Sequence, residues 1–204
     1  MNELERRLTD TSAADPALHR LQETLARRAQ ERGLLDIAYR TLDTPAGQLL
    51  LAATRTGLVR VAYPRQDHDT VLADLAVRIS PRILHAPAQL DAAAHQLEEY
   101  FSAARHTFDL PLDLQLAHGF RRTVLEHLPS VAFGHTISYA GLATDIGNPR
   151  AVRAVGTACA TNPLPVVIPC HRVVRSDGTP GEYIGGPDVK TQLLHLENAA
   201  ADPV

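Results

Sequence analysis

The chain has 204 residues, of which 45% are hydrophobic and 21% are charged, and its formal net charge is -3. This composition is ordinary for a globular protein, and it excludes disordered, collagen-like and coiled-coil classes. The longest apolar runs, such as Pro163 to Cys170, fall far short of the roughly 20 residues that span a bilayer. The N-terminal residues lack the apolar stretch of a signal peptide, and two cysteines cannot build a disulfide framework. We therefore expect a cytoplasmic protein that does not associate with a membrane.

The charge is unevenly distributed along the chain. Between Ala117 and Arg175 there are six arginines and only two acidic residues, a local balance of +4, which leaves about -7 for the remainder. The overall charge gives no sign of nucleic-acid binding, but a basic stretch within an acidic protein can supply a local footprint for phosphates.

Residues 1–34 form a separate, highly charged segment. Twelve of these 34 residues are charged, six of each sign. The apolar residues at helical spacing are Leu18, Leu21 and Leu25. We predict an amphipathic helix over 16–32, with Asp15 as N-cap and Gly33 as its end, and a weaker helix near 2–8. Such an extension most often packs on a neighbouring domain, and the alternative is an arm that binds a partner.

Residues 35–112 have the pattern of a small α/β domain. Three short alternating runs joined by glycine-containing turns predict an antiparallel meander, followed by two helices. The expected strands cover 36–41, 48–54, 58–63 and, as a candidate last strand, 108–112, and the expected helices cover 67–79 and 89–104. This region has no cysteine, and its histidines lack the spacing of metal ligands. We therefore interpret it as a scaffold and expect no metal.

Residues 113–204 are predicted to be mainly helical. A helix is expected over 118–128, Ser138 can cap a short helix over 139–146, and Asn148 can cap a second helix that runs to Thr161. Helix, glycine-containing turn and helix is the layout of a helix-turn-helix, although many helical hairpins look the same. On the second helix, Arg150 and Arg153 would project from a slim surface of alanine and glycine, which suits either DNA contact or close helix packing.

Cys170 is the residue with the strongest chemical pattern. It follows an apolar run that ends in Pro169 and precedes His171 and Arg172. Because the thiolate is the nucleophilic form of cysteine, an adjacent imidazole and guanidinium would favour reactivity. A buried structural cysteine is the alternative, and it suits Cys159, which lies among alanines on a predicted helix.

Five segments together with a C-terminal helix resemble one family. In order and spacing they are similar to the O6-alkylguanine-DNA alkyltransferases, also called methylated-DNA–protein-cysteine methyltransferases. The matching positions are 138–143, 147–156, 162–163, 168–174 and 181–186, then Lys190, Leu193, Leu194 and Glu197. The resemblance is dense from Phe120 to Glu197, loose over the first 112 residues, and absent from residues 1–34.

The resemblance implies a fold and a reaction. The fold would be an α/β first domain with a small antiparallel sheet, ribonuclease-H-like, over 35–112, and a winged helix-turn-helix domain over 113–204. The reaction would transfer an alkyl group from O6 of guanine in DNA to Cys170, once per molecule and without a cofactor. Repair of O4-alkylthymine and the preferred alkyl group are left open.

The same resemblance implies roles for individual residues. His171, acting through a water, would take the thiol proton, Glu197 would hold the imidazole, Asn162 would orient the turn, and Tyr139 would donate a proton to the departing guanine. The remaining pocket residues would be Val173, whose carbonyl reads the guanine amino group, Tyr183 and Ile184, which form the wall and the O6 contact, and Cys159.

Double-stranded DNA is the implied partner. Because the reactive carbon lies inside the stacked duplex, the base must be flipped out, and Arg153 would enter the stack in its place from a helix in the minor groove. The other implied DNA contacts are Arg150, Ala154, Thr157 and Ser138. We expect a monomer in solution.

Three alternatives and a few departures from the family pattern remain. The alternatives are a damage sensor that binds lesions without repair, a Cys-His hydrolase, and a winged-helix regulator. The departures are Leu125 in place of a common tryptophan, Ala132 and Phe133 where the family often has a proline before Gly134-His135-Thr136, and Ile184 at a variable pocket position.

Overall fold

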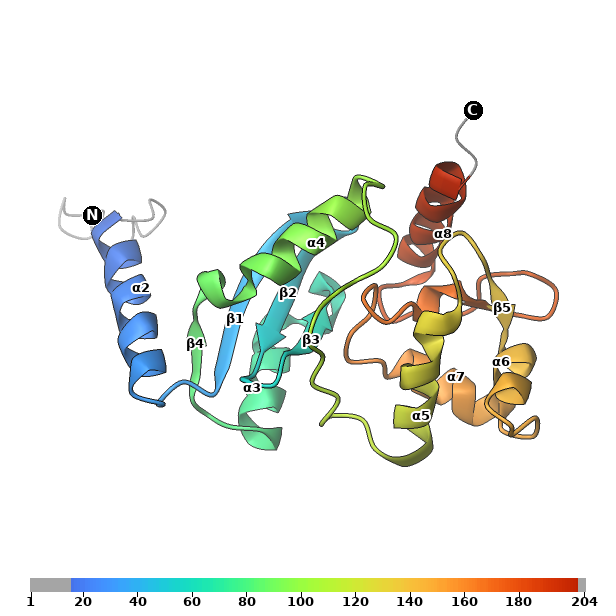
Figure 1. The fold of residues 1–204 in the computed structure, drawn as a ribbon, viewed down its shortest axis with the longest axis horizontal. Helices are drawn as coiled ribbons and strands as arrows, with labels where there is room; N and C mark the ends of the chain where they lie inside the picture. Colours follow the sequence, from blue (N-terminus) through green and yellow to red (C-terminus); the bar gives the residue numbers. More distant parts are fainter. Residues whose placement is uncertain (1–15, 202–204) are drawn as a thin grey trace, which may run out of the picture.

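The computed structural model of the protein describes residues 16–201, and Figure 1 shows an α/β half and a mainly helical half side by side. The α/β half contains a four-stranded sheet of order β3-β2-β1-β4. Its strands are β1 (Ile37–Thr44), β2 (Gly47–Ala53), β3 (Leu58–Ala62) and β4 (Ile83–His85), and its helices are α3 (His68–Arg78) and α4 (Asp91–Phe101). The predicted meander of β1, β2 and β3 is confirmed by their antiparallel pairing.

Both faces of this sheet are buried. Along β2 the side chains alternate, so that Leu49 and Leu51 belong to the large core cluster that also contains Leu97 and Tyr100 of α4. The residues between them, Leu50 and Ala52, belong to a second cluster with Val71 and Leu75 of α3. The two helices therefore cover opposite faces, and α4 carries the face that is continuous with the helical half.

Two strand predictions in this half need correction. The sheet is mixed, because β4 pairs in parallel with β1, and β4 was missed since three residues after a proline are too few to show alternation. The segment 108–112 is not a strand. It makes a single bridge between Leu112 and Leu58, and Pro111 has no N–H for a ladder, although its carbonyl accepts from Leu58. Gly57 permits this approach, since a Cβ there would lie 2.1 Å from the Pro111 oxygen.

The helix predicted in the N-terminal segment is present as α2 (Pro16–Glu31). It ends as expected at Gly33, which has φ +66°, and Leu34 N–H bonds back to Ala29. The residues that pack are Ala26 and Ala29, whereas Leu21 and Leu25 are 65% and 54% exposed. Leu21 and Leu25 therefore do not lie on the packing face of this helix. The weaker helix near residues 2–8 and the Asp15 cap lie outside the described residues.

The helical half consists of four α-helices and a two-stranded parallel sheet within the described range. The helices are α5 (Gly119–His127), α6 (Tyr139–Asp145), α7 (Val152–Ala160) and α8 (Pro187–Ala201), and the strands are β5 (Ile137–Ser138) and β6 (Val173–Val174). The Ser138 cap is confirmed, since its hydroxyl accepts from the Gly141 N–H at 2.9 Å. Helices α6 and α7 are joined by a glycine-containing turn, as the helix-turn-helix prediction requires.

The start of the second helix was predicted three residues too early. Asn148 is not its cap. Its N–H bonds to the Ala143 carbonyl at the end of α6, and its carbonyl accepts from Ala151, so that residues 148–151 form a turn. The cap position of α7 is Ala151. Arg150 therefore lies in this turn and does not share a helical face with Arg153.

The two halves share one core and several direct bonds. The large core cluster includes Leu49 and Leu97 from the first half and Leu125 and Leu193 from the second. At the edge of the sheet, the Val61 N–H of β3 donates to the Pro163 carbonyl at 2.8 Å. The segment that leads to Cys170 is thereby bonded to the sheet edge, and the expected combination of an α/β first half with a helical second half is confirmed.

Candidate active site around Cys170

Cys170 begins a single turn of 3₁₀ helix, Cys170–Arg172, directly after Pro169. The turn is closed by two short-range bonds, from the Cys170 N–H to the Ile168 carbonyl and from the Arg172 N–H to the Pro169 carbonyl. The side chain is only 1% exposed. The thiol thus lies in the core between the two halves.

Asn162 holds the loop that carries Cys170. Its Nδ2 donates to the Ile168 carbonyl at 2.9 Å and lies 3.1 Å from Cys170 Sγ, and its Oδ1 accepts from the Leu164 N–H at 2.9 Å. Within this loop Val166 has φ +74°, a conformation that costs a β-branched residue about 1–3 kcal/mol. The buried amide therefore stabilises a strained turn and donates to the sulfur.

His171 and Glu197 form a buried pair. Nε2 of His171 lies 2.8 Å from Oε1 of Glu197, and the two side chains are 0% and 1% exposed. Arg172 binds the same carboxylate through both oxygens, each at 2.9 Å. The Gly134 N–H adds a bond to Oε2 at 3.2 Å. Glu197 on α8 is thus the centre of a hydrogen-bond network in which every partner is a donor.

This network fixes the protonation states of its members. Although burial raises the pKa of Glu197, the bonds from His171 and Arg172 outweigh it and lower the pKa to about 2. Burial lowers the pKa of His171, against the opposing effect of Glu197. A neutral imidazole that donates through Nε2 has its lone pair on Nδ1. That atom is buried and has no hydrogen-bond partner within the described part of the chain.

Tyr100 of α4 also reaches this network. Its hydroxyl donates to Oε1 of Glu197 at 2.7 Å and lies 3.3 Å from Nε2 of His171. The sequence interpretation assigned no chemistry to this half of the chain, so Tyr100 was missed. Its pattern in the sequence is that of one more apolar position on a helix, which gives no signal of a polar role.

The electrostatics of Cys170 differ from the expectation. Burial raises the pKa of its thiol to about 11. The two largest influences that oppose this rise are the Asn162 hydrogen bond and the charge of Lys190, and the sequence neighbours His171 and Arg172 are not among the causes. Those neighbours turn toward Glu197 instead. The thiol is therefore protonated at neutral pH and needs a base.

Lys190 lies on α8, interacts electrostatically with Cys170 and was not predicted to take part. It is 0% exposed, its Nζ donates to the Val173 carbonyl at 2.6 Å, and it lies 5.7 Å from the centre of the Tyr139 ring. Burial is the largest influence on the pKa of Tyr139 and raises it to about 12. A signal was available in the sequence, because Lys190 is the only lysine among 20 basic residues.

Tyr183 lies beside His171, with ring centres 6.3 Å apart. It is buried, and its hydroxyl lies 3.1 Å from the hydroxyl of Tyr63 in the first half. The backbone of Gly185 lies so near the Tyr63 ring that a Cβ there would be 2.9 Å from it. Ile184 between them is half-buried, and Cys159 is buried on α7 with its pKa raised by burial. Of the expected pocket residues, Cys159 and Tyr183 interact electrostatically with Cys170, and Tyr63, which was not expected, does so as well.

The residues expected to contact DNA lie on or near α7. Arg153, Ala154 and Thr157 are exposed on that helix, and Arg150 is exposed in the preceding turn. Ser138 is half-buried and is used as the cap of α6. An exposed arginine at the start of a slim helix is therefore available for a ligand.

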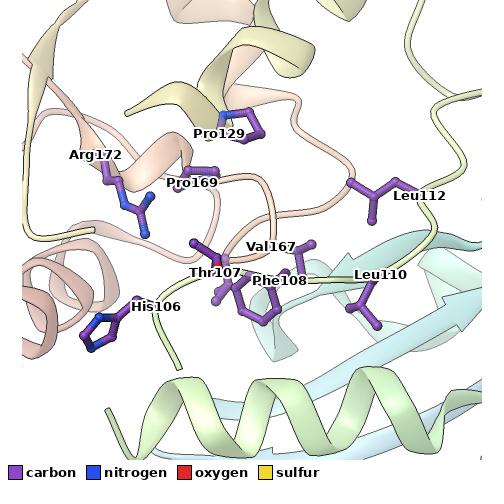
Figure 2. A pocket seen from close by; sticks show the side chains of 10 residues that line it. His106, Thr107, Phe108, Leu110, Leu112, Pro129, Val167, Pro169 and Arg172 are labelled. Carbon is purple, nitrogen blue, oxygen red and sulfur yellow. The ribbon is translucent and has the colours of Figure 1, made fainter. Parts of the chain in front are cut away.

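A separate small cavity of about 120 Å³ lies on the other side of the Cys170 loop. Figure 2 shows Phe108 and Leu110 of the connecting segment on one side of it and Pro169 and Arg172 on another. Neither Cys170 nor His171 lines it.

Within residues 16–201 there is no group of three His, Cys, Asp or Glu side chains that could hold a metal. Over the same range, each helix is too short or too polar to cross a membrane.

Comparisons with known proteins give the family. The ribonuclease-like domain of 6-O-methylguanine DNA methyltransferase matches residues 37–114, and the DNA binding domain of the same family matches residues 119–199. The methylated-DNA–protein-cysteine methyltransferase of Methanosarcina barkeri is 36% identical over 78% of this chain and 96% of its own length. The Ada protein of Escherichia coli is 38% identical over 80% of this chain, which spans only 46% of Ada.

Solved structures agree with these matches. The Mycobacterium tuberculosis O6-methylguanine methyltransferase superposes with a TM-score of 0.72 at 33% identity, covering 82% of this chain and 96% of its own. The same bacterium's OGT in complex with DNA gives a TM-score of 0.71 at 34% identity, with coverage of 81% and 96%. The chain belongs to the 6-O-methylguanine DNA methyltransferase family.

Proposed function

We propose that the protein repairs DNA by moving an alkyl group from O6 of guanine to Sγ of Cys170, once per molecule. The observation that carries this proposal is that Cys170, which accepts from Asn162, shares one 3₁₀ turn with His171, whose imidazole is held by Glu197. A thiol with a raised pKa stands next to a neutral imidazole whose Nδ1 has no partner in the described residues. Nucleophile, base and orienting carboxylate are thus all present.

The reaction begins with removal of the thiol proton. His171 accepts it on Nδ1 through a water, and Glu197 stabilises the resulting imidazolium through Nε2. The sulfur attacks the alkyl carbon, the S–C bond forms and the bond from carbon to O6 breaks. Guanine leaves with the electron pair and takes a proton from the hydroxyl of Tyr139. The proton that His171 removed from the thiol then restores that hydroxyl. The thioether has no route back to a thiol, so each molecule reacts once.

The neighbouring residues form the guanine pocket. The carbonyls of Cys170 and Val173 accept from the guanine amino group, and the second lone pair of the Val173 carbonyl remains for this purpose beside the Lys190 bond. Tyr183 forms a wall of the pocket, the main chain at Ile184 binds O6, and Cys159 closes the far side.

The substrate is double-stranded DNA that contains O6-alkylguanine. Helix α7 enters the minor groove, Arg153 takes the place of the flipped nucleotide, and Arg150, Ala154, Thr157 and Ser138 contact the backbone. The +4 balance between Ala117 and Arg175 supports attraction to phosphates in any sequence. A relative of this chain with 34% identity has been solved in complex with DNA.

The organisation of the protein is part of the same proposal. We divide it into an extension over 1–34, an α/β domain over 35–112 and the alkyltransferase domain over 113–204. The protein works as a monomer in the cytoplasm without a cofactor. Since the chain spans about half of the Ada relatives, activities of their other half are not carried over.

Intact mass spectrometry tests the function directly. The protein is incubated with a duplex that carries one O6-methylguanine, and the product is digested and mapped. We expect a gain of one methyl on the Cys170 peptide that saturates at one per protein and no gain for Cys170→Ser. Cys159→Ser lacks the other cysteine, and its gain should still saturate at one methyl on the Cys170 peptide, whatever the effect of this pocket residue on the rate. Lesion binding without any mass change would replace repair with damage sensing, and methylation of another residue would refute Cys170 as acceptor.

A further inference from the structure

Tyr100 lies at the junction between the sheet half and the proposed catalytic network. It is on the last turn of α4, is 0% exposed, and its hydroxyl lies 2.7 Å from Oε1 of Glu197, 97 residues away in the sequence. The same hydroxyl lies 3.3 Å from Nε2 of His171. A residue of the first half therefore touches both members of the buried pair.

The hydroxyl acts as a donor to the carboxylate. Burial and the nearby negative charge of Glu197 raise the pKa of Tyr100, so its proton stays in place, and Glu197 remains ionised because its own pKa is lowered to about 2. The proton points to Oε1, the oxygen that also accepts from His171 Nε2. Tyr100 and His171 thus share Oε1 with one nitrogen of Arg172, while a second nitrogen of Arg172 and the Gly134 N–H bind Oε2.

The ring of Tyr100 is fixed independently of its hydroxyl. It packs against Phe101, Phe108 and Phe133 with ring centres 5.4 to 6.1 Å apart. This packing fixes the ring in an orientation that directs its hydroxyl toward Glu197. A phenylalanine at this position keeps these ring contacts and removes a single donor.

We propose that Tyr100 is a positioning residue of the first domain, which holds the Glu197 carboxylate so that His171 keeps its proton on Nε2 and presents Nδ1 as the base. This inference rests on the proposed function and deepens it. Tyr100 does not reach the reacting atoms and acts through Glu197. The first domain then supplies part of the proton-transfer machinery in addition to supporting the fold.

The proposal predicts how His171 responds to loss of the hydroxyl. The groups that face His171 are Tyr100 of α4, Glu197 and Lys190 of α8, its neighbours Cys170 and Arg172, and Tyr183. Among these, Arg172 and Tyr100 share Oε1 with His171, and the neutral donor of the two is Tyr100. When the Tyr100 hydroxyl is removed, Oε1 of Glu197 stabilises the His171 imidazolium more strongly. His171 then gains its second proton at a higher pH, and the orientation of its ring is less restricted.

Tyr100→Phe tests this, with Tyr39→Phe as the matched control. Tyr39 lies on β1 of the same half, and its ring packs against His85 far from the network in sequence. The first measurement is the ¹⁵N NMR titration of the His171 imidazole, which requires no alkyl transfer. We expect the titration of Tyr100→Phe to move up by about one pH unit, which is a tenfold change in proton affinity. The control should match the unmodified protein.

The second measurement is the rate of alkyl transfer from free O6-benzylguanine and from a lesion-containing duplex. For Tyr100→Phe we expect a roughly tenfold slower plateau on both substrates, with the acid limb shifted as in the NMR titration. An unshifted His171 titration, or a plateau rate equal to the control, overturns the proposal even if the variant is less stable. Failure of the unmodified protein to transfer alkyl groups would refute the proposed function, while the NMR titration still decides the role of Tyr100.

Discussion

Nδ2 of Asn162 lies 3.1 Å from Sγ of Cys170 and 2.9 Å from the carbonyl oxygen of Ile168. One amide group therefore donates to the nucleophile and to the backbone two residues before it. The third bond of the same side chain, from the Leu164 N–H, fixes the other end of the loop. Because Asn162 is 0% exposed, water cannot replace any of these bonds.

Asn162→Ala should therefore affect stability and chemistry together. The substitution leaves the Ile168 carbonyl and the Leu164 N–H buried without partners, which predicts a loss of about 2–4 kcal/mol in the free energy of unfolding. It also removes the hydrogen bond that lowers the pKa of the Cys170 thiol, so transfer should slow. Urea unfolding and single-turnover rates measure the two effects. Asn148→Ala, at an exposed turn position, is the control and should change neither.

Lys190→Met removes the buried charge and keeps an unbranched side chain that can fill the same space. Lys190 lowers the pKa of Cys170 and donates to the Val173 carbonyl, so its removal should raise the thiol pKa above about 11 and slow transfer at least several-fold. Stability should change less than for Asn162→Ala, because a buried charge is itself costly to desolvate. Transfer from free O6-benzylguanine over a range of pH measures the rate. An unchanged rate at every pH would contradict this role for Lys190.

The pH dependence of the unmodified protein follows from His171. The reactive form is the neutral imidazole, and burial lowers the pKa of His171 from the ordinary value of 6.5. Lowering the pH therefore removes the base only below 6.5. We expect the transfer rate to fall to half of its maximum only below pH 6.5, measured within seconds of a pH jump so that acid unfolding does not intervene. A half-maximal rate above pH 6.5 would mean that a different group is the base.

Most of the helical half could be predicted because its signals are local. Ser138 caps α6 through a bond to Gly141 three residues later, and Cys170, His171 and Arg172 share one turn, so sequence neighbours are also spatial neighbours. The predicted start of α7 was wrong, although its signals are local as well. Asn148 and Pro149 suit a helix start, but the bond from Asn148 to Ala143 keeps the chain in a turn until Ala151.

The parts of the site that were missed depend on distant contacts. Tyr100 lies 71 residues from His171, and Tyr63 lies 120 residues from Tyr183. Both have the spacing of core residues, and only the packing of α4 and β3 against the Cys170 loop turns their hydroxyls toward the site. Arg172 was expected to act on the thiol, but its guanidinium is planar and pairs with both oxygens of Glu197. Such choices between two nearby acceptors are made by three-dimensional geometry.

Arg153→Ala should slow repair of duplex DNA far more than reaction with the free base. Arg153 is exposed at the start of α7 and has no part in the network around Cys170. If it takes the place of the flipped nucleotide, its loss raises the cost of extrusion, which is a few kcal/mol, and leaves the chemistry intact. Transfer rates on a lesion-containing duplex and on free O6-benzylguanine give the comparison, with Arg27→Ala on α2 as control. Equal slowing on both substrates would refute this assignment.

Glu197→Gln should lower the free energy of unfolding at neutral pH and make it depend less on pH in the acid range. The carboxylate is paired with Arg172 and His171 in the core, and removing one partner of a buried pair costs about 3–5 kcal/mol. Its pKa is lowered from 4.5 to about 2, so the stabilisation is present above pH 4.5 and is lost as the pH falls toward 2. Urea unfolding between pH 7 and pH 2 should show a steep loss for the unmodified protein and a shallower one for the variant. The surface pair Arg122–Glu126 provides the control, because Glu126→Gln should cost only about 0–1 kcal/mol and leave the acid profile unchanged. A variant as stable as this control at pH 7 would show that the buried carboxylate contributes nothing net to the fold.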